Sequence, residues 1–343
     1  MSKKNKILFV GNFLSGSRGS VGVIEGLASS FDRSKFDFKL TSKFENKIIR
    51  TVDILFSLLF SKYSLIHVDI YSGQAFYLTR ISVFIASLRQ KKVIGTLHGG
   101  GLPKFDKNNP KLLFNVLKKF QLLQSPSNFL INYFKKYNLT INYLPNPVLL
   151  ELFTSKQNAI DKFSFLWVRA FDAIYNPDLA IKIIGKLKEH IPEVKLTMIG
   201  PDRGELKKCK KLIKKLKIEK NVKILGYIPN RDLPKYYNSH FFYLNTTSFE
   251  SFGLSLIEAA SCGNIIFSTS VGDIAFSWKH NENIILINSF NEDDFCSSIL
   301  NLINNEKLIK KIRANAVCRT KEFDHKKIAK KWNQLLEKIL IDE

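Results

Sequence analysis

The chain has 343 residues, 45% of them hydrophobic, which makes it too long for one small core and too apolar to be disordered. Its net charge is +23, with 22 lysines and arginines against 7 acids in residues 1–150 and 31 against 23 in residues 151–343. This charge favours anionic partners, but no RNP-like aromatic motif, zinc-finger spacing or arginine-rich stretch accompanies it, so nucleic acid is not an expected partner. The four cysteines form no C-x-x-C pair, which fits a reducing compartment and predicts neither zinc nor disulfides.

The first ten residues combine a basic start with an apolar run. Gly11 and Asn12 end this run early, which predicts a first strand rather than a leader peptide. The longest apolar stretches, Ile54–Phe60 and Ile81–Leu88, are shorter than the roughly 18 residues that a membrane-spanning helix needs. The sequence therefore predicts a cytoplasmic protein with no membrane-spanning helix.

Short apolar runs alternate with amphipathic helical patterns through the first half of the chain. Strands are predicted over 7–10, 65–68 and 92–97, and helices over 21–30, 73–88 and 111–119. This alternation predicts a parallel sheet covered by helices. The series ends at Asn142–Val148, where two prolines indicate a hinge between domains.

A second series of the same kind follows the hinge. Strands are predicted over 163–168, 195–199, 222–225, 241–244 and 265–268, with helices over 177–190, 205–217 and 253–262. A last amphipathic pattern over 324–340 predicts a long closing helix. The expected fold class is α/β, with two Rossmann-like domains.

Two glutamates, Glu250 and Glu258, are separated by seven residues across a predicted loop and helix. Ligands of open α/β sheets bind beyond the carboxyl ends of the strands, so this junction is a candidate site. Glu258 lies between Ile257 and Ala259, and a carboxylate buried there needs hydrogen-bond donors, which a ribose diol would supply. The alternative is an exposed helix position with a local partner.

This E-x7-E element resembles the signature of glycosyltransferase family 4, a large retaining family with the GT-B fold. The likeness extends over most of the chain and is strongest in the second half. It implies two facing Rossmann-like domains, 1–149 on the acceptor side and 150–323 on the donor side. It also implies that the C-terminal helix, 324–343, crosses back to the first domain.

The resemblance implies a role for each glutamate. Glu258 would bind the donor ribose, and Glu250 would lie near the transferred sugar as the catalytic carboxylate. The residues between them would bind the diphosphate through backbone amides at a helix N-terminus, where oriented dipoles favour negative charge. These donor-binding residues are Ser251, Phe252, Gly253 and Leu254. Because no D-x-D motif is present, protein cations and amides would take the place of a metal, and no cofactor is expected.

Arg169, just after the predicted strand 163–168, matches the arginine that opens the family's donor-phosphate element. Its guanidinium suits bidentate binding of phosphate, although a surface salt bridge is the structural alternative. The family places a lysine a few residues later, whereas this chain has Tyr175 or Asn176 there. A tyrosine hydroxyl can still donate a hydrogen bond to phosphate, so Tyr175 is a candidate donor-binding residue. The missing lysine could instead signal weakened activity.

Other glycines and loops match the family less specifically. Gly200 resembles the glycine at a strand end near the donor, and Tyr227 with Ile228 resembles the segment that cradles the base. In the first half, Gly11, Gly16 and Gly19 do not have the spacing G-x-G-x-x-G, so a dinucleotide site is not expected. The resemblance instead brings the loop with Gly16 and Ser17 toward the donor phosphates, and an ordinary turn is the alternative.

His98 ends the predicted strand 92–97 and is followed by three glycines. A strand-end position with room beside it favours a functional imidazole, although most single histidines are structural. The family often has a histidine here near the donor sugar, which makes His98 a second candidate catalytic residue.

The function that the resemblance implies is retaining transfer of a hexose or related sugar from a UDP- or GDP-linked donor to a glycan or lipid-linked acceptor, in bacterial surface polysaccharide synthesis. The acceptor would attack on the face that the diphosphate leaves. The basic first half suggests an anionic membrane surface as a further partner and a peripheral position on its inner face, with residues 109–119 as a contact segment if they are not core. An inactive sugar-nucleotide-binding protein and a sugar-nucleotide epimerase are the alternatives.

Overall fold

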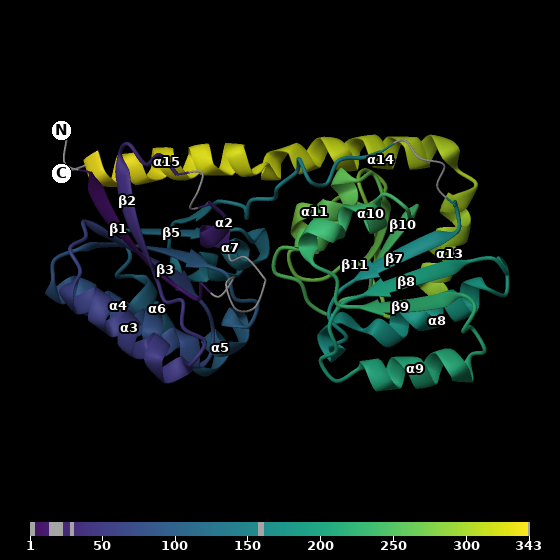
Figure 1. Ribbon diagram of the computed structural model, residues 1–343, viewed down its shortest axis with the longest axis horizontal. Helices are drawn as coiled ribbons and strands as arrows, with labels where there is room; N and C mark the ends of the chain where they lie inside the picture. The colour runs from purple at the N-terminus through teal and green to yellow at the C-terminus, as the bar shows by residue number, and fades with distance from the viewer. Residues whose placement is uncertain (1–3, 14–22, 28–30, 157–160, 342–343) are drawn as a thin grey trace. The chain divides into compact units, whose positions relative to one another are not determined.

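A computed structural model gives the fold of the chain and describes residues 4–13, 23–27, 31–156 and 161–341. The chain divides into two compact units, one of residues 1–147 with 325–343 and one of residues 148–324. Each unit is a parallel sheet with helices on its faces (Figure 1).

The sheet of the first unit has six strands in the order β2-β1-β3-β4-β5-β6, all parallel. The strands are β1 (Asn5–Val10), β2 (Phe36–Thr41), β3 (Leu65–Ile70), β4 (Lys92–Leu97), β5 (Leu122–Ser125) and β6 (Ile141–Tyr143). The described helices of this unit are α2 (Val23–Leu27), α3 (Lys47–Phe60), α4 (Gln74–Leu88), α5 (Leu102–Asn108), α6 (Pro110–Leu117), α7 (Asn128–Phe134) and α15 (His325–Ile341).

Both faces of this sheet are buried because successive side chains of a strand point to opposite sides. Leu8 and Val10 of β1 pack with α3, α4, α6 and α7 in one apolar cluster. Ile7 and Phe9 pack with α2 and α15 in another. The near-continuous apolar strands that marked the sequence are the consequence of this two-sided burial.

The closing helix α15 belongs to the first unit although the chain reaches it from the second. Trp332 is 2% exposed, and its ring lies 6.4 Å from that of Phe9 and 6.1 Å from that of Phe31. Ile328 and Leu336 continue the same buried stripe at helical spacing. The predicted return of the C-terminal helix to the first domain is therefore present.

The sheet of the second unit also has six parallel strands, in the order β12-β11-β10-β7-β8-β9. The strands are β7 (Ser164–Val168), β8 (Lys195–Ile199), β9 (Val222–Gly226), β10 (Phe242–Asn245), β11 (Ile265–Thr269) and β12 (Ile285–Ile287). The described helices are α8 (Pro177–Leu187), α9 (Leu206–Lys215), α10 (Pro234–Tyr237), α11 (Leu254–Ser261), α12 (Ile274–Ser277), α13 (Glu292–Ile303) and α14 (Glu306–Thr320). One face of the sheet packs on α8, α9 and α13, and the other on α10, α11 and α12.

The prediction of two βα arrays with parallel sheets is confirmed. Every strand predicted from the sequence is present, with ends that differ by at most two residues from those expected. The helices predicted over 73–88 and 324–340 are α4, over 74–88, and α15, over 325–341, so their ends differ by at most one residue from those expected. Within the described part of the chain, no helix is long and apolar enough to cross a membrane.

Candidate active site

The carboxyl ends of four adjacent strands form one edge of the second sheet. Arg169 follows β7, Gly200 follows β8, Thr246 follows β10 and Ser270 follows β11. Since β7 lies between β10 and β8 in the sheet, residues far apart in sequence meet at this edge.

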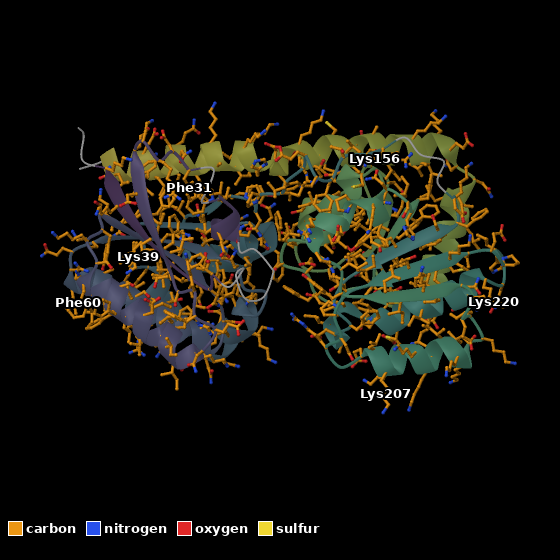
Figure 2. All side chains as sticks on the ribbon, in the orientation of Figure 1. Phe31, Lys39, Phe60, Lys156, Lys207 and Lys220 are labelled. Atoms are coloured by element: carbon orange, nitrogen blue, oxygen red, sulfur yellow. The ribbon has the colours of Figure 1, made fainter. Side chains whose placement is uncertain are left out.

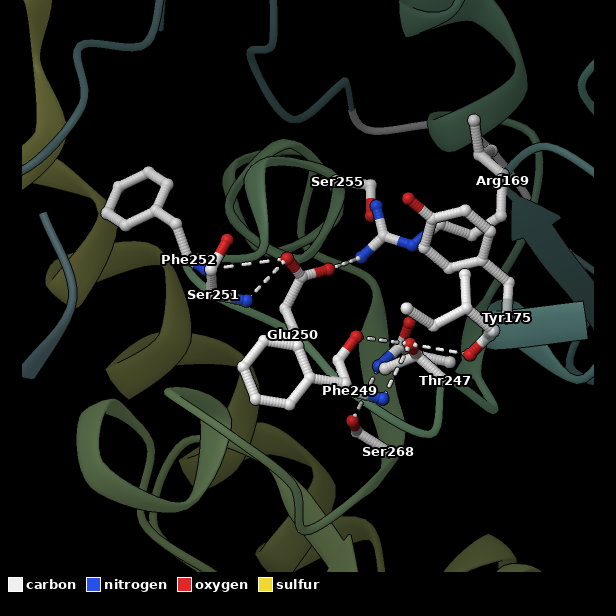
Figure 3. Close-up of polar contacts among 12 residues, drawn as sticks. Arg169, Tyr175, Thr247, Phe249, Glu250, Ser251, Phe252, Ser255 and Ser268 are labelled. Atoms are coloured by element: carbon white, nitrogen blue, oxygen red, sulfur yellow. Dashed lines mark hydrogen bonds and ion pairs between the residues drawn. The ribbon is translucent and has the colours of Figure 1, made fainter. Parts of the chain in front are cut away.

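Arg169 and Glu250 form an ion pair at this edge, with Nη2 of the arginine 2.7 Å from Oε2 of the glutamate (Figure 3). The other carboxylate oxygen, Oε1, accepts hydrogen bonds from the amides of Ser251 at 3.0 Å and Phe252 at 3.4 Å. The side chains of Arg169 and Glu250 are 12% and 15% exposed, so solvent screens the pair only partly. Burial alone would lower the pKa of Arg169, but the carboxylate of Glu250 raises it above its ordinary value.

The backbone of Glu250 is fixed by two glycines in the left-handed region. Gly272 has a φ of +52°, and a side chain there would place its Cβ 2.0 Å from the carbonyl oxygen of Glu250. The next residue, Asp273, donates its amide to that same oxygen at 2.8 Å. Gly253, with a φ of +86°, is the residue just before α11, and a Cβ added there would lie 3.5 Å from Cγ of Glu250. The short, glycine-bounded loop therefore holds Glu250 in one place.

Glu258 is buried inside α11 with 7% exposure. Tyr237 donates its hydroxyl to Oε2 at 2.9 Å, and Asn230 donates Nδ2 to Oε1 at 3.3 Å. Burial raises the pKa of Glu258 from 4.5 to about 7, against the opposing effect of these two hydrogen bonds and of Arg169. Any further hydrogen-bond donor would stabilise the ionised form of this carboxyl group, and a pair of hydroxyl groups would supply two such donors.

The residues of the 251–254 segment differ in what they expose. The side chain of Phe252 is 6% exposed and packs edge-on against Phe323 at 5.6 Å, so only its backbone is available. Leu254 is 42% exposed at the start of α11. Ser255, in the first turn, accepts a hydrogen bond from buried Tyr243 at 2.8 Å. The start of α11 thus presents backbone amides beside Glu250, which suits an anion.

Tyr175 lies next to Arg169, and its ring centroid is 5.4 Å from the guanidinium carbon. Its carbonyl accepts a hydrogen bond from Thr246 at 2.8 Å, which ties this turn to the end of β10. The residue in the place of the expected lysine is therefore packed against the arginine.

In the segment expected to cradle the base, Tyr227 is 58% exposed and Ile228 is partly buried. Gly16 and Ser17 lie outside the described residues.

Gly200 allows β7 and β8 to approach closely at their ends. A Cβ at this position would lie 1.7 Å from the carbonyl oxygen of Arg169, and the φ is +154°. The amide of Arg169 donates a hydrogen bond to the carbonyl oxygen of Ile199, the residue before Gly200, at 3.0 Å. The glycine thus fixes the backbone from which the Arg169 side chain projects.

Gly200→Ala is expected to lower the free energy of unfolding by about 3 kcal/mol or more, because the added Cβ overlaps backbone that cannot move alone. The control is Gly204→Ala, where φ is +111° and no atom lies within 4 Å of an added Cβ. That variant should lose only about 1 kcal/mol, the ordinary cost of a side chain in this conformation. Urea unfolding followed by circular dichroism compares the two. Equal losses would show that the contact with Arg169 is not the reason for the glycine.

His98 lies at the corresponding edge of the first sheet, directly after β4. Its Nε2 is 3.1 Å from Oδ1 of Asp69, near the end of β3, and its ring stacks on Tyr71 at 5.6 Å. Gly11 makes room for this pair, since a Cβ there would lie 2.6 Å from Oδ2 of Asp69. The aspartate holds the imidazole in one orientation, with 7% of the histidine side chain exposed.

Sequence reasoning missed the partners of its candidate residues. Asp69 is an acid within an apolar strand, a pattern that could have drawn attention to it. Tyr237 and Asn230 carry no such signal, because their pairing with Glu258 depends on packing between separate elements. No group of three or more His, Cys, Asp or Glu side chains is arranged to hold a metal ion in the described ranges.

Residues 151–318, nearly all of the second unit, match the sequence model of the family described as glycosyl transferases group 1. The phosphatidylinositol N-acetylglucosaminyltransferase GPI3 subunit of Saccharomyces cerevisiae is 28% identical over 142 residues, which are 39% of this chain and 31% of that protein. The chain therefore matches less than a third of that relative's length. In sequence, the second unit is similar to glycosyltransferases.

Two solved structures share the fold along nearly the whole chain. Sucrose-phosphate synthase from Thermosynechococcus elongatus aligns with a TM-score of 0.80 at 16% identity, over 99% of this chain and 100% of that one. HepE from Anabaena, in complex with UDP and glucose, aligns with a TM-score of 0.76 at 15% identity, over 98% and 100%. Identities this low show the fold alone. The predicted α/β fold of the GT-B type is thereby confirmed.

Proposed function

We propose that the chain is a retaining, metal-independent glycosyltransferase whose second unit binds a nucleoside diphosphate sugar at the carboxyl edge of its sheet. The observation that carries this proposal is the ion pair of Arg169 and Glu250 beside the start of α11. A cation, a row of backbone amides and a carboxylate lie together there, which are the groups that departure of a diphosphate from a sugar requires.

Each of these groups stabilises the charge that develops beside it during the reaction. As the bond from the anomeric carbon to the diphosphate breaks, negative charge grows on the leaving oxygen, where Arg169 and the amides of α11 stabilise it. Positive charge grows on the sugar, where the carboxylate of Glu250 stabilises it. The acceptor hydroxyl forms the new bond on the same face and passes its proton to the departing diphosphate oxygen, so the configuration is retained. His98, which Asp69 holds in the first unit, stays a predicted catalytic residue.

The ribose and the base of the donor bind to the residues that flank this centre. Glu258 accepts hydrogen bonds from the ribose hydroxyls, and the exposed ring of Tyr227 stacks on the base. Tyr175 replaces the usual lysine with a neutral donor, which leaves Arg169 as the main phosphate cation of this edge. UDP is the first donor nucleotide to test, because HepE is a structural neighbour solved with UDP and glucose.

The acceptor is a glycan or a lipid-linked saccharide, and the product belongs to a bacterial surface polysaccharide. The name of the yeast relative, whose acceptor is phosphatidylinositol, supports a lipid-linked acceptor. The net charge of +23 supports a peripheral position on the anionic inner face of a membrane.

A thermal-shift panel of nucleoside diphosphates and their sugars tests the donor site. A donor at about a hundred times its Kd adds about 2.7 kcal/mol of stability, which raises the melting temperature of the second unit by roughly 5 to 10 °C. The same panel on Arg169→Gln should show a much smaller rise. If no nucleoside diphosphate raises the melting temperature of the wild-type protein, the donor site is wrong.

An inactive sugar-nucleotide-binding protein is the second candidate, because Tyr175 stands where the family has a lysine. Binding alone would give the same thermal shift. Release of the free nucleoside diphosphate, measured with and without acceptor saccharides, separates the two. Tight binding with no release for any acceptor would favour the binding protein.

A further inference from the structure

Helices α3 and α4 of the first unit expose an unusual amount of apolar surface. They pack against each other on the same side of the first sheet (Figure 1). Ten large apolar side chains on these two helices are exposed, from 38% for Ile81 to 76% for Ile48. Those of α3 are Ile48, Ile49, Val52, Phe56, Leu59 and Phe60, and those of α4 are Tyr77, Ile81, Phe84 and Leu88.

Their spacing places these side chains in continuous stripes. The four on α4 recur at intervals of four, three and four residues, so they lie on one side of the helix, opposite Phe76 and Val83 in the core. On α3, the rings of Phe56 and Phe60 are in contact, tilted by 44° with their centroids 4.9 Å apart, and Figure 2 labels Phe60 on the outer surface of the unit. Helices of a globular unit bury one stripe, whereas α3 and α4 each carry a second one that is exposed.

A groove between α4 and α6 extends this apolar surface. It has a volume of about 600 Å³ and is lined by Tyr77, Ile81 and Phe84 of α4 and by Leu112 of α6, with Arg80 and Lys119 at its sides. The core residues of α6, Leu113 and Leu117, are fully buried. Only part of the segment 109–119 expected from the sequence as a membrane contact is therefore available, and the larger surface lies on α3 and α4.

The charges around the apolar stripes are predominantly positive. Between residues 43 and 91 there are seven lysines and arginines against three acids. The acid on α3, Asp53, accepts a hydrogen bond from Thr41 at 2.9 Å, and Asp69 is buried beside His98. Lys47, Arg80 and Lys119 have no acidic partner among the residues that the structure describes. Apolar side chains flanked by free cations are complementary to a surface with an apolar interior and anionic headgroups.

We propose that α3, α4 and α6 form a docking face for an anionic lipid bilayer, with the apolar stripes entering the headgroup boundary and the groove receiving a lipid chain. Buried apolar area and electrostatic attraction add in such interfacial binding. The proposal deepens the proposed function, because it places the unit assigned to the acceptor on the membrane that would carry a lipid-linked acceptor.

Flotation with phosphatidylcholine vesicles, with and without phosphatidylglycerol, tests this face directly. The wild-type protein should float with the anionic vesicles and lose most of that binding in high salt. Phe56→Ser with Phe84→Ser should weaken the binding more than tenfold, whereas Phe290→Ser with Leu152→Ser, at exposed apolar positions of the second unit, should leave it unchanged. A wild-type protein that does not float, or a loss that both double variants share, would overturn the proposal.

A second pair of variants separates a localised face from the overall charge. Arg80→Gln with Lys119→Gln should weaken binding about twenty-fivefold, since each cation near an anionic surface contributes about fivefold. Lys207→Gln with Lys211→Gln removes the same charge from exposed α9 of the second unit and should have little effect. Equal losses from the two pairs would show that the net charge, and not this face, binds the lipid.

Two further readouts distinguish other outcomes. A mass that doubles with concentration in the wild-type protein, but not in Phe56→Ser with Phe84→Ser, would mean that the face binds a second copy of the chain and would overturn the proposal. The thermal shift by UDP or GDP is recorded for every variant. A variant that loses vesicle binding but keeps its thermal shift has lost the docking face and kept the donor site. The two proposals can therefore fail separately, because the donor residues and the docking face lie in different units.

Discussion

Glu250→Gln is expected to lower the turnover number for sugar transfer by roughly a hundredfold to a thousandfold, the usual loss when one fixed charge is removed from a reacting centre. The affinity for the nucleoside diphosphate should stay the same or increase. The guanidinium of Arg169 is paired with Glu250 at 2.7 Å, so a bound phosphate would share that cation with the carboxylate. Removal of the carboxylate charge leaves the cation to the phosphate alone.

Arg169→Gln is the matched variant for this prediction, because it removes the other half of the same ion pair. It should weaken binding of the nucleoside diphosphate by about tenfold to a hundredfold. Glu219→Gln, at an exposed position of the second unit, controls for the change of charge alone. Initial-rate kinetics give the turnover number, and calorimetry with UDP or GDP gives the affinity. If Glu250→Gln turns over as fast as the wild-type protein, Glu250 has no part in the reaction.

Glu258→Gln is expected to stabilise the protein above neutral pH while it weakens nucleotide binding. In the unfolded chain this carboxyl loses its proton near the ordinary pKa of 4.5, whereas burial raises its pKa in the folded protein to about 7. Between these values the folded state binds more protons, so the free energy of unfolding falls as pH rises through this window and is constant above it. The total fall is about 3 kcal/mol. Glutamine does not ionise and should not show it.

Urea unfolding at about pH 5 and about pH 8 measures this difference. The variant should be more stable than the wild-type protein by about 2 to 3 kcal/mol at the higher pH and close to it at the lower. Nucleoside diphosphate affinity should fall by about tenfold to a hundredfold, because charged acceptors bind hydroxyl groups more strongly than neutral ones. The wild-type protein should also prefer UDP over 2′-deoxy-UDP, and the variant should not. An unchanged preference would remove Glu258 from the ribose site.

The sequence predicted the βα alternation well because each strand of a two-sided parallel sheet is a compact apolar run. It missed β2 and α3 for opposite reasons. Phe36, Phe38 and Leu40 of β2 alternate with polar residues, which is typical of a sheet edge and weaker than a continuous run. In α3 the apolar residues continue around the helix, so no single face marks its boundaries.

The sequence predicted which residues belong to the candidate site, but it did not predict which of them are in contact. Arg169 and Glu250 are 81 positions apart, and they meet because β7 and β10 are neighbours in the sheet. Strand order is a property of the whole fold, and no local pattern encodes it. The resemblance to a family supplied the residues of the edge, whereas the raised pKa of Glu258 required knowledge of its burial and of Tyr237.

The position of α15 also governs the order in which the two units can be completed on the ribosome. The core of the first unit includes Trp332 and Leu336, which are synthesised after all of residues 148–324. At 5 to 20 residues per second, the nascent first unit waits roughly 10 to 35 s for its last helix, while the second unit can already form its core. During that interval the apolar surface around Phe9 and Phe31 lacks its cover. The unit that begins first therefore finishes last, and it is the one that a chaperone would have to protect.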